Sequence, residues 1–118
     1  MNSIFFENLS SLSINAYPHC EIKHSELGGK DFRVSLVTIQ PHHNAEKITH
    51  QLSSELAFLL SGSMEATINE GKHIANPGDL IYIPKGHSHS FKCLSDSCEI
   101  LVVHTPNVAF NTDHNLSK

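Results

Sequence analysis

Histidine is the residue type in this sequence most able to do chemistry, because ten histidines occur among 118 residues. The imidazole titrates near neutral pH and is a common metal ligand. Two histidines stand near turn residues at the edges of predicted strands: His50 shortly before Glu55, and His89 just after the turn at 84–86. Two imidazoles and one carboxylate suit Fe, Mn, Ni, Cu or Zn, and such a set leaves coordination positions open for catalysis.

The surroundings of Glu55 strengthen this interpretation. The residues that follow it, 56–60, read Leu-Ala-Phe-Leu-Leu. Burying an unpaired carboxylate in such a run is costly, so a metal ion or a protonated histidine should lie nearby. We therefore take His50, Glu55 and His89 as candidate ligands of one divalent transition metal ion.

The elements that position these residues are predicted to be short strands. Apolar or alternating segments separated by Gly and Pro run along most of the chain. Such spacing is typical of an antiparallel sandwich or barrel, and we predict a small all-β jelly-roll barrel. We expect a polar loop over 42–53 and strands over 32–40, 55–60, 64–69, 72–75, 80–83, 88–93 and 98–104.

The length fits a single domain covering residues 1–118. Residues 1–31 are predicted to form an N-terminal arm that packs on a surface, and residues 32–106 to form the barrel. The polar tail, 107–118, is expected to be frayed.

The composition of the chain argues against some classes of binding partner. The formal net charge of −4 argues against binding nucleic acid or an anionic membrane. No signal peptide is visible and no apolar stretch approaches a membrane span, so we expect a cytoplasmic protein. The odd number of cysteines favours reduced, packed thiols, although Cys93 and Cys98 could face each other across a hairpin.

Two segments resemble the paired motifs of the cupin superfamily. The second cupin motif, G-x5-P-x-G-x2-H-x3-N, is matched from Gly78 to His89, and Cys93 stands where the family has Asn. The first motif, G-x5-H-x-H-x3–4-E-x6-G, is matched at His50, Glu55 and Gly62. Ile48 occupies the place of the family's first histidine.

The resemblance covers about residues 32–106 and carries several expectations. It implies a double-stranded β-helix (jelly-roll) barrel, a homodimer, and a small-molecule ligand inside the barrel. It also implies three of the family's four metal ligands: His50, Glu55 and His89. Ile48 removes the fourth, so the site could either bind a metal with three protein ligands or have lost it.

His104 is the candidate catalytic residue. It ends the last predicted long strand, and in cupin-like barrels that strand lines the cavity. His104 could be a general base, a substitute ligand or a substrate contact, and the plainer alternative is a residue at the rim.

Two functions from different classes follow. The first is a metal-dependent enzyme acting on a small organic molecule, with oxygenase, lyase, isomerase or cyclase chemistry implied by the resemblance. The alternative is a non-catalytic cupin that binds or senses a small molecule with a degenerate or empty metal site. Retention of Glu55 favours the enzyme, and Ile48 favours the binding module.

Overall fold

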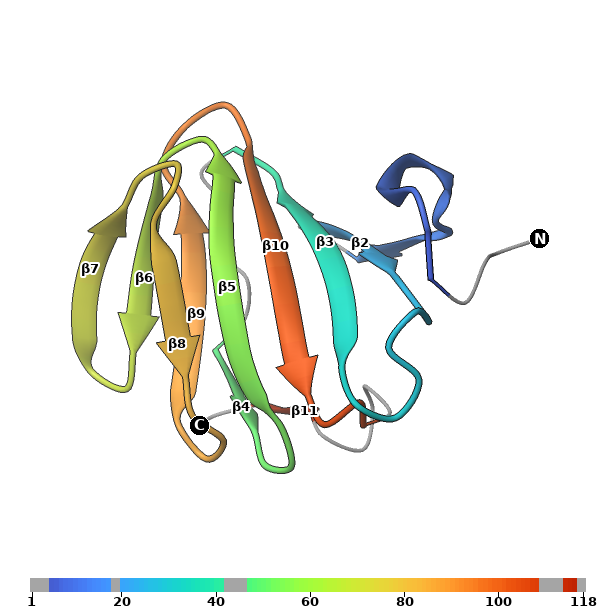
Figure 1. Cartoon of the computed structure of the whole chain (residues 1–118). Helices are drawn as coiled ribbons and strands as arrows, with labels where there is room; N and C mark the ends of the chain where they lie inside the picture. The colour runs from blue at the N-terminus through green and yellow to red at the C-terminus, as the bar shows by residue number, and fades with distance from the viewer. Residues whose placement is uncertain (1–4, 18–19, 42–46, 109–113, 117–118) are drawn as a thin grey trace.

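A computed structural model describes residues 5–17, 20–41, 47–108 and 114–116 (Figure 1). No helix among these residues is long and apolar enough to cross a membrane. Apart from the 3-10 helix η1 (Leu9–Ser11), the regular elements in these ranges are strands. They are β1 (Ile14–Tyr17), β2 (Cys20–His24), β3 (Arg33–Ile39), β4 (Ile48–His50), β5 (Ser54–Ser61), β6 (Met64–Ile68), β7 (Gly71–Ala75), β8 (Leu80–Ile83), β9 (Ser88–Cys93), β10 (Cys98–Thr105) and β11 (His114–Leu116).

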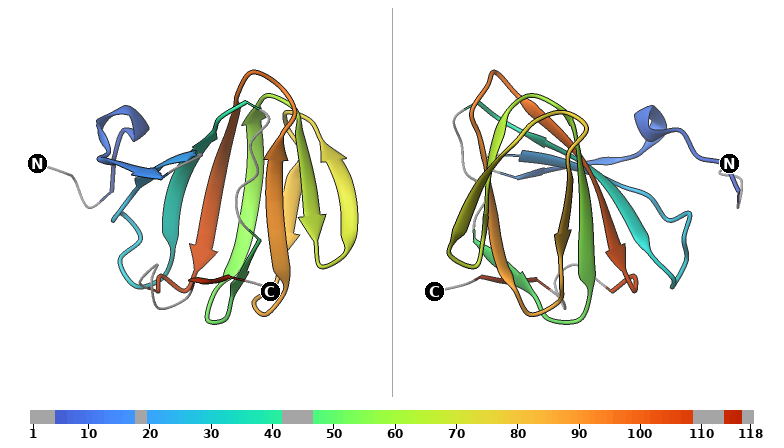
Figure 2. Two further views of the ribbon diagram at one scale, coloured as in Figure 1. Left: turned by 180° about the vertical axis from the view of Figure 1, so that it is seen from behind. Right: turned by 60° about the vertical axis from the view of Figure 1, so that its left-hand side comes forward.

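The strands form two antiparallel sheets that face each other. One sheet has the order β1-β2-β3-β10-β5-β8 and the other β11-β4-β9-β6-β7. The chain crosses repeatedly between the sheets, and the two sheets enclose a common interior (Figures 1 and 2). The predicted all-β jelly-roll barrel is confirmed.

Alternation along the strands divides the side chains between the interior and the outer surface. On β5, Ala57 and Leu59 are buried while Leu56 and Leu60 are exposed. The interior of the barrel is therefore apolar along most of its length. Its largest buried side chains are Ile39, Leu59, Met64, Ile83 and Ile100.

The cysteine thiols are free, and two of them belong to this core. Cys98 donates a hydrogen bond to the Ser63 carbonyl oxygen at 3.1 Å, and Cys93 to the Ser95 carbonyl oxygen at 3.3 Å. Burial, and next the contact with Cys93, raise the pKa of Cys98 to about 11. Two packed free thiols therefore stand where the alternative was a disulfide across the hairpin.

The turn between β5 and β6 depends on a glycine. Gly62 has φ of +91°, and a Cβ placed there would lie 2.2 Å from the Ser97 carbonyl oxygen. A side chain is thus opposed both by the backbone conformation and by the neighbouring loop. Gly62, the last position of the first motif, fixes the hairpin that begins with Glu55's strand.

Strands occur in three places where the sequence predicted none. The expected arm holds β1 and β2, which extend the first sheet by pairing onto β3. The expected loop 42–53 holds β4, and the tail expected to be frayed holds β11, which pairs with β4. These strands are polar or only three to five residues long. Pairing with a neighbour, rather than a hydrophobic pattern of their own, determines their conformation.

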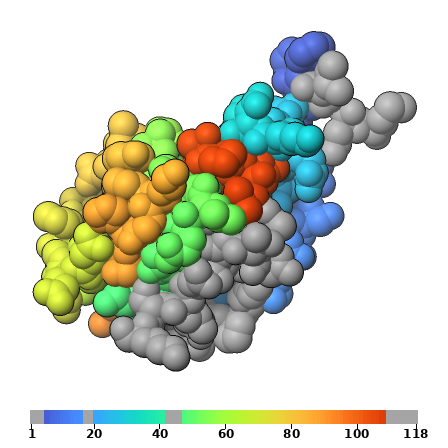
Figure 3. Space-filling model, turned by 90° about the horizontal axis from the view of Figure 1, so that it is seen from below, coloured from blue at the N-terminus to red at the C-terminus, as the bar shows by residue number. Residues whose placement is uncertain are grey.

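One end of the barrel gathers the strand ends that carry the candidate residues. Figure 3 views this end directly, and shows the turn around residues 28–32 beside the segment that follows β10. The contact is a pair of hydrogen bonds: the Asn107 backbone N–H donates to Lys30 and its side-chain amide to Gly29. The loops at this end therefore hold one another in place.

Candidate metal centre

The registers of three strands bring Glu55 and His104 together. In β10, His104 lies opposite Glu55 of β5 on one side and opposite Arg33 of β3 on the other. Facing residues of an antiparallel pair project to the same side of the sheet. All three side chains are buried, so this row points into the barrel.

The second sheet supplies the other two histidines. His50 ends β4, and His89 lies on β9, where it faces Ile48 across the β4–β9 pair. Ile48 and His50, two residues apart, share one face of their strand. Ile48 therefore lies on the same face as both histidines, as its place in the motif predicts. An isoleucine thus stands on the inner face where the motif has a histidine.

The three histidines converge on one carboxylate oxygen. The Nε2 atoms of His50 and His89 each lie 3.4 Å from Glu55 Oε1, and His104 Nε2 lies 2.9 Å from the same oxygen. The His50 ring stacks on His89 at a centroid distance of 5.2 Å and meets His104 edge-on at 4.6 Å. All four candidate site residues of the sequence analysis are thus brought together.

Electrostatics keep Glu55 ionised. Burial alone would raise the pKa of this carboxyl, but hydrogen bonds from His104, His50 and His89 outweigh it and hold the pKa well below its ordinary value. Burial lowers the pKa of His104, although Glu55 opposes the shift. The cluster therefore consists of a carboxylate surrounded by imidazoles, of which His104 is neutral at pH 7.

The donor set fits a divalent transition metal. His50, Glu55 and His89 each offer one ligand atom, these atoms lie within 4.8 Å of one another, and all three residues are buried. Two imidazole nitrogens and one carboxylate oxygen are ligands that Fe, Mn, Ni, Cu and Zn accept. His104 lies outside this three-residue group and contacts two of its members, Glu55 and the ring of His50.

Sequence reasoning missed Arg33 and His24. Arg33 is buried opposite His104, and His24 projects from β2 beside it. One signal was present: Arg33 is the only arginine of the chain and stands at an inward position of an alternating strand. Strand β2, which carries His24, gave no comparable pattern.

Two packed antiparallel sheets with a buried His–Glu cluster at one end define a jelly-roll barrel with an internal candidate metal centre. The sequence model of the family described as "Cupin domain" matches residues 35–104, more than half of the chain. The chain belongs to the cupin family. The family predicted from the two motifs is thereby confirmed.

Solved structures support the same fold. KdgF from Halomonas sp. superposes with a TM-score of 0.81 at 17% identity, covering 92% of this chain and 97% of that one. A variant of oxalate decarboxylase from Bacillus subtilis gives a TM-score of 0.83 at 18% identity, covering 98% of this chain and 35% of the enzyme. A cupin-superfamily sugar phosphate isomerase from Silicibacter pomeroyi gives 0.71 at 24% identity, covering 85% and 74%. A search of curated proteins found no match.

Proposed function

We propose that this cupin is a metal-dependent enzyme that acts on a small organic molecule, with lyase or isomerase chemistry. The observation that carries the proposal is the convergence of three buried histidines on the Glu55 carboxylate. Of the four reaction types the resemblance implies, these two fit best because they depend on moving a proton, and His104 adjoins the centre. Similar structures include a decarboxylase and an isomerase.

His50, Glu55 and His89 would hold the metal ion, which supplies a Lewis acid inside the barrel. Ionised Glu55 contributes negative charge, and the apolar core above the site limits access of water. Mn²⁺ is the first ion to test, because oxalate decarboxylase, a structural neighbour, is described with Mn(II) centres.

His104 is proposed as the catalytic residue. Its Nε2–H donates to Glu55 Oε1 at 2.9 Å, so in the neutral ring Nδ1 is the nitrogen that can accept a proton; among the described residues, Nδ1 is buried and has no hydrogen-bond partner. Because burial keeps the pKa of His104 below its ordinary value, the imidazole is neutral at pH 7 and available as a base.

Titration of metal-free protein with Mn²⁺ tests two assignments. One is that His50 and His89 are metal ligands, and the other is that His104 is a catalytic residue and not a ligand. We expect the double variant His50→Ala/His89→Ala to abolish specific binding. The control variant His73→Ala/His87→Ala removes two exposed histidines and should bind as the parent does. His104→Gln should weaken Mn²⁺ binding by roughly 10- to 100-fold, because it removes the hydrogen-bond partner of a ligand, whereas the double variant loses two ligands and should show no specific binding. Equal affinity in parent and both double variants would refute the proposed centre.

Ile48 supports a second candidate, a cupin that binds or senses a small molecule without catalysis. An apolar side chain faces His89 where a fourth ligand would be expected. Ile48→His separates the two functions. An enzyme with a three-ligand centre should gain Mn²⁺ affinity from a fourth imidazole. A protein that binds no Mn²⁺ before the substitution, and gains a site only with it, would favour the binding module.

The proposal extends to the assembly and the location of the protein. We propose a homodimer, formed through the outer face of β5 and β8, where Leu56, Leu80 and Tyr82 are exposed. We propose a cytoplasmic location, because all three cysteines are free thiols, as in proteins of reducing compartments.

A further inference from the structure

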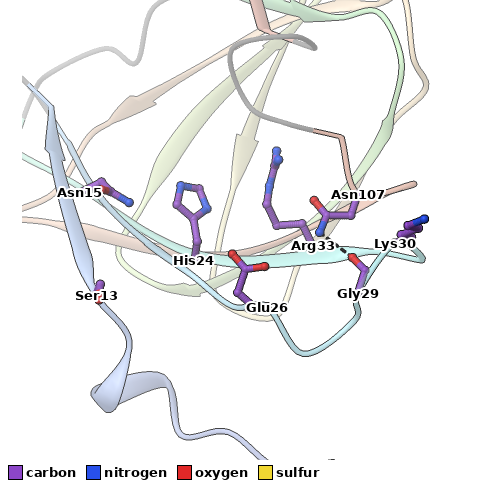
Figure 4. Close-up of a pocket in the computed structure, with 8 residues that line it drawn as sticks. All are labelled: Ser13, Asn15, His24, Glu26, Gly29, Lys30, Arg33 and Asn107. Carbon is purple, nitrogen blue, oxygen red and sulfur yellow. Dashed lines mark hydrogen bonds between the residues drawn. The ribbon is translucent and has the colours of Figure 1, made fainter. Parts of the chain in front are cut away.

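A polar cavity of about 540 Å³ lies beside the candidate metal centre. Its walls come from the N-terminal strands, the turn after β2, and the segment after β10 (Figure 4). The residues used below are Asn15, His24, Glu26, Lys30, Arg33 and Asn107. None of them belongs to the two motif segments, 48–62 and 78–93.

Arg33 joins the cavity to the centre. Its side chain is buried, with the residue only 6% exposed, and one Nη donates a hydrogen bond to the Val108 carbonyl oxygen. It faces His104 across the β3–β10 pair, which places the two Cα atoms about 5 Å apart. Figure 4 shows Arg33 and His24 projecting to the same side of the sheet. A molecule seated on this guanidinium would therefore reach His104.

The positive charge of Arg33 acts on the neighbouring His24. Burial is the main cause that lowers the pKa of His24, and Arg33 lowers it further. His24 is thus neutral at pH 7, and its Nδ1 is 2.9 Å from the Ser35 hydroxyl. The cavity therefore holds the fixed cation of Arg33 beside the neutral imidazole of His24.

The charges around the cavity fit a monoanion. Arg33 and Lys30 are cationic and Glu26 is anionic, which leaves one net positive charge among these residues. Asn15 and Asn107 add neutral amides, and Asn107 is fixed by its hydrogen bond to the Gly29 carbonyl oxygen at 2.7 Å. A carboxylate matches one guanidinium through two parallel hydrogen bonds. A phosphate dianion would meet repulsion from Glu26 without a second buried cation.

We propose that this cavity binds the carboxylate end of a small, polar organic acid, with Arg33 as its anchor. The inference rests on the proposed function in one respect: the atoms next to the carboxylate then lie toward His104 and the Glu55 cluster. The side-chain amides of Asn15 and Asn107 would form hydrogen bonds with hydroxyl groups of the same molecule. The substrate class is thus a hydroxylated monocarboxylic acid.

The single arginine makes a direct test possible. In ¹⁵N-labelled protein, Arg33 is the only source of an arginine Nε–Hε signal. Protein treated with EDTA is titrated with D-gluconate, with uncharged sorbitol and with inorganic phosphate. In the variants Arg33→Gln, Arg33→Lys and Lys30→Gln, ligand binding is measured from the shifts of the backbone amide signals. Lys85→Gln, at an exposed lysine, is the control. Arg33→Lys keeps the charge, and Lys30 is exposed, so the test survives if Arg33→Gln fails to fold.

We expect gluconate to shift the Arg33 signal saturably and sorbitol to leave it unchanged. Arg33→Gln should weaken gluconate binding about tenfold or more, since hydrogen bonds to charged groups are the strong ones. Arg33→Lys and Lys30→Gln should each weaken it a few-fold, and Lys85→Gln not at all. Gluconate binding that persists in the absence of metal supports the carboxylate site at Arg33, even if the proposed metal-dependent enzyme activity is refuted.

Four results would overturn the inference. Gluconate binding that disappears on removal of metal would place the carboxylate on the metal ion instead, leaving the proposed enzyme intact. Phosphate binding tighter than gluconate would refute a carboxylate site. Absence of any shift at Arg33, or equal binding of gluconate and sorbitol, would exclude an anion anchor.

Discussion

Glu55 is the residue on which the site depends. Three imidazoles direct their Nε2 atoms at one of its oxygens, and the carboxyl is buried with a pKa held well below its ordinary value. An ionised group in such a place is stable only because polar partners surround it. The carboxylate therefore holds the three histidines in place even before a metal binds.

Removing the carboxylate should destabilise the metal-free protein. Glu55→Ala leaves buried imidazoles without their acceptor, and we expect a loss of about 2 kcal/mol in the free energy of unfolding. Glu55→Gln keeps one acceptor and should lose about half of that. Urea unfolding in the presence of EDTA measures both, with Glu65→Gln on the outer face of β6 as control. A parent-like stability for Glu55→Ala would show that the histidines do not depend on the carboxylate.

At the scale of the elements, strand register does the positioning. The β5–β10 and β3–β10 pairs place Glu55, His104 and Arg33 in one inward row, and β4 brings Ile48 opposite His89. A shift of one residue in any of these pairs would turn the side chains outward. The turns that fix the registers are therefore as important as the strands.

Gly62 offers a test of one such turn. Gly62→Ala meets a left-handed φ of +91° and a contact of 2.2 Å with the Ser97 carbonyl oxygen. Gly78 is the matched control, because its φ is +94° with nothing within 4 Å of an added Cβ. We expect Gly62→Ala to lower the free energy of unfolding by about 2 kcal/mol more than Gly78→Ala. Equal losses in the free energy of unfolding would mean that the loop containing Ser97 moves aside and does not constrain the hairpin.

The predictable and unpredictable elements differ in how their conformation is determined. Strands such as β8 and β9, with apolar or alternating sequences between Gly and Pro turns, were expected at their observed bounds. β4 has only three residues and β1 lies at a sheet edge, so a partner strand determines each. Similarly, motif spacing indicated His50, Glu55 and His89, whereas the Arg33 cavity depends on the unpredicted β1 and β2.

At the scale of the whole molecule, one outer face is apolar. Leu56 faces Tyr82 and Phe58 faces Leu80 across the β5–β8 pair, and Leu80 and Tyr82 are more than half exposed. Contiguous exposed apolar surface of this kind is typical of protein–protein contacts. The outer face of the same strands that carry Glu55 inward is thus the proposed dimer surface.

Light scattering after size-exclusion chromatography tests the dimer. We expect the parent protein to elute as a dimer and Leu80→Glu/Tyr82→Glu as a monomer, because two charges would be buried at the interface. Lys72→Glu on β7 is exposed and should leave the mass unchanged. A monomeric parent at high micromolar concentration would refute a homodimer, and a dimeric double variant would place its interface elsewhere.

The metal content of the purified protein tests the central claim most directly. Protein prepared without a histidine tag or added metal is analysed by elemental mass spectrometry beside His50→Ala/His89→Ala. The buried His–His–Glu set predicts about one transition metal ion per chain in the parent and none in the variant. Trace metal in the parent that is unchanged in the double variant would contradict a metal-dependent function.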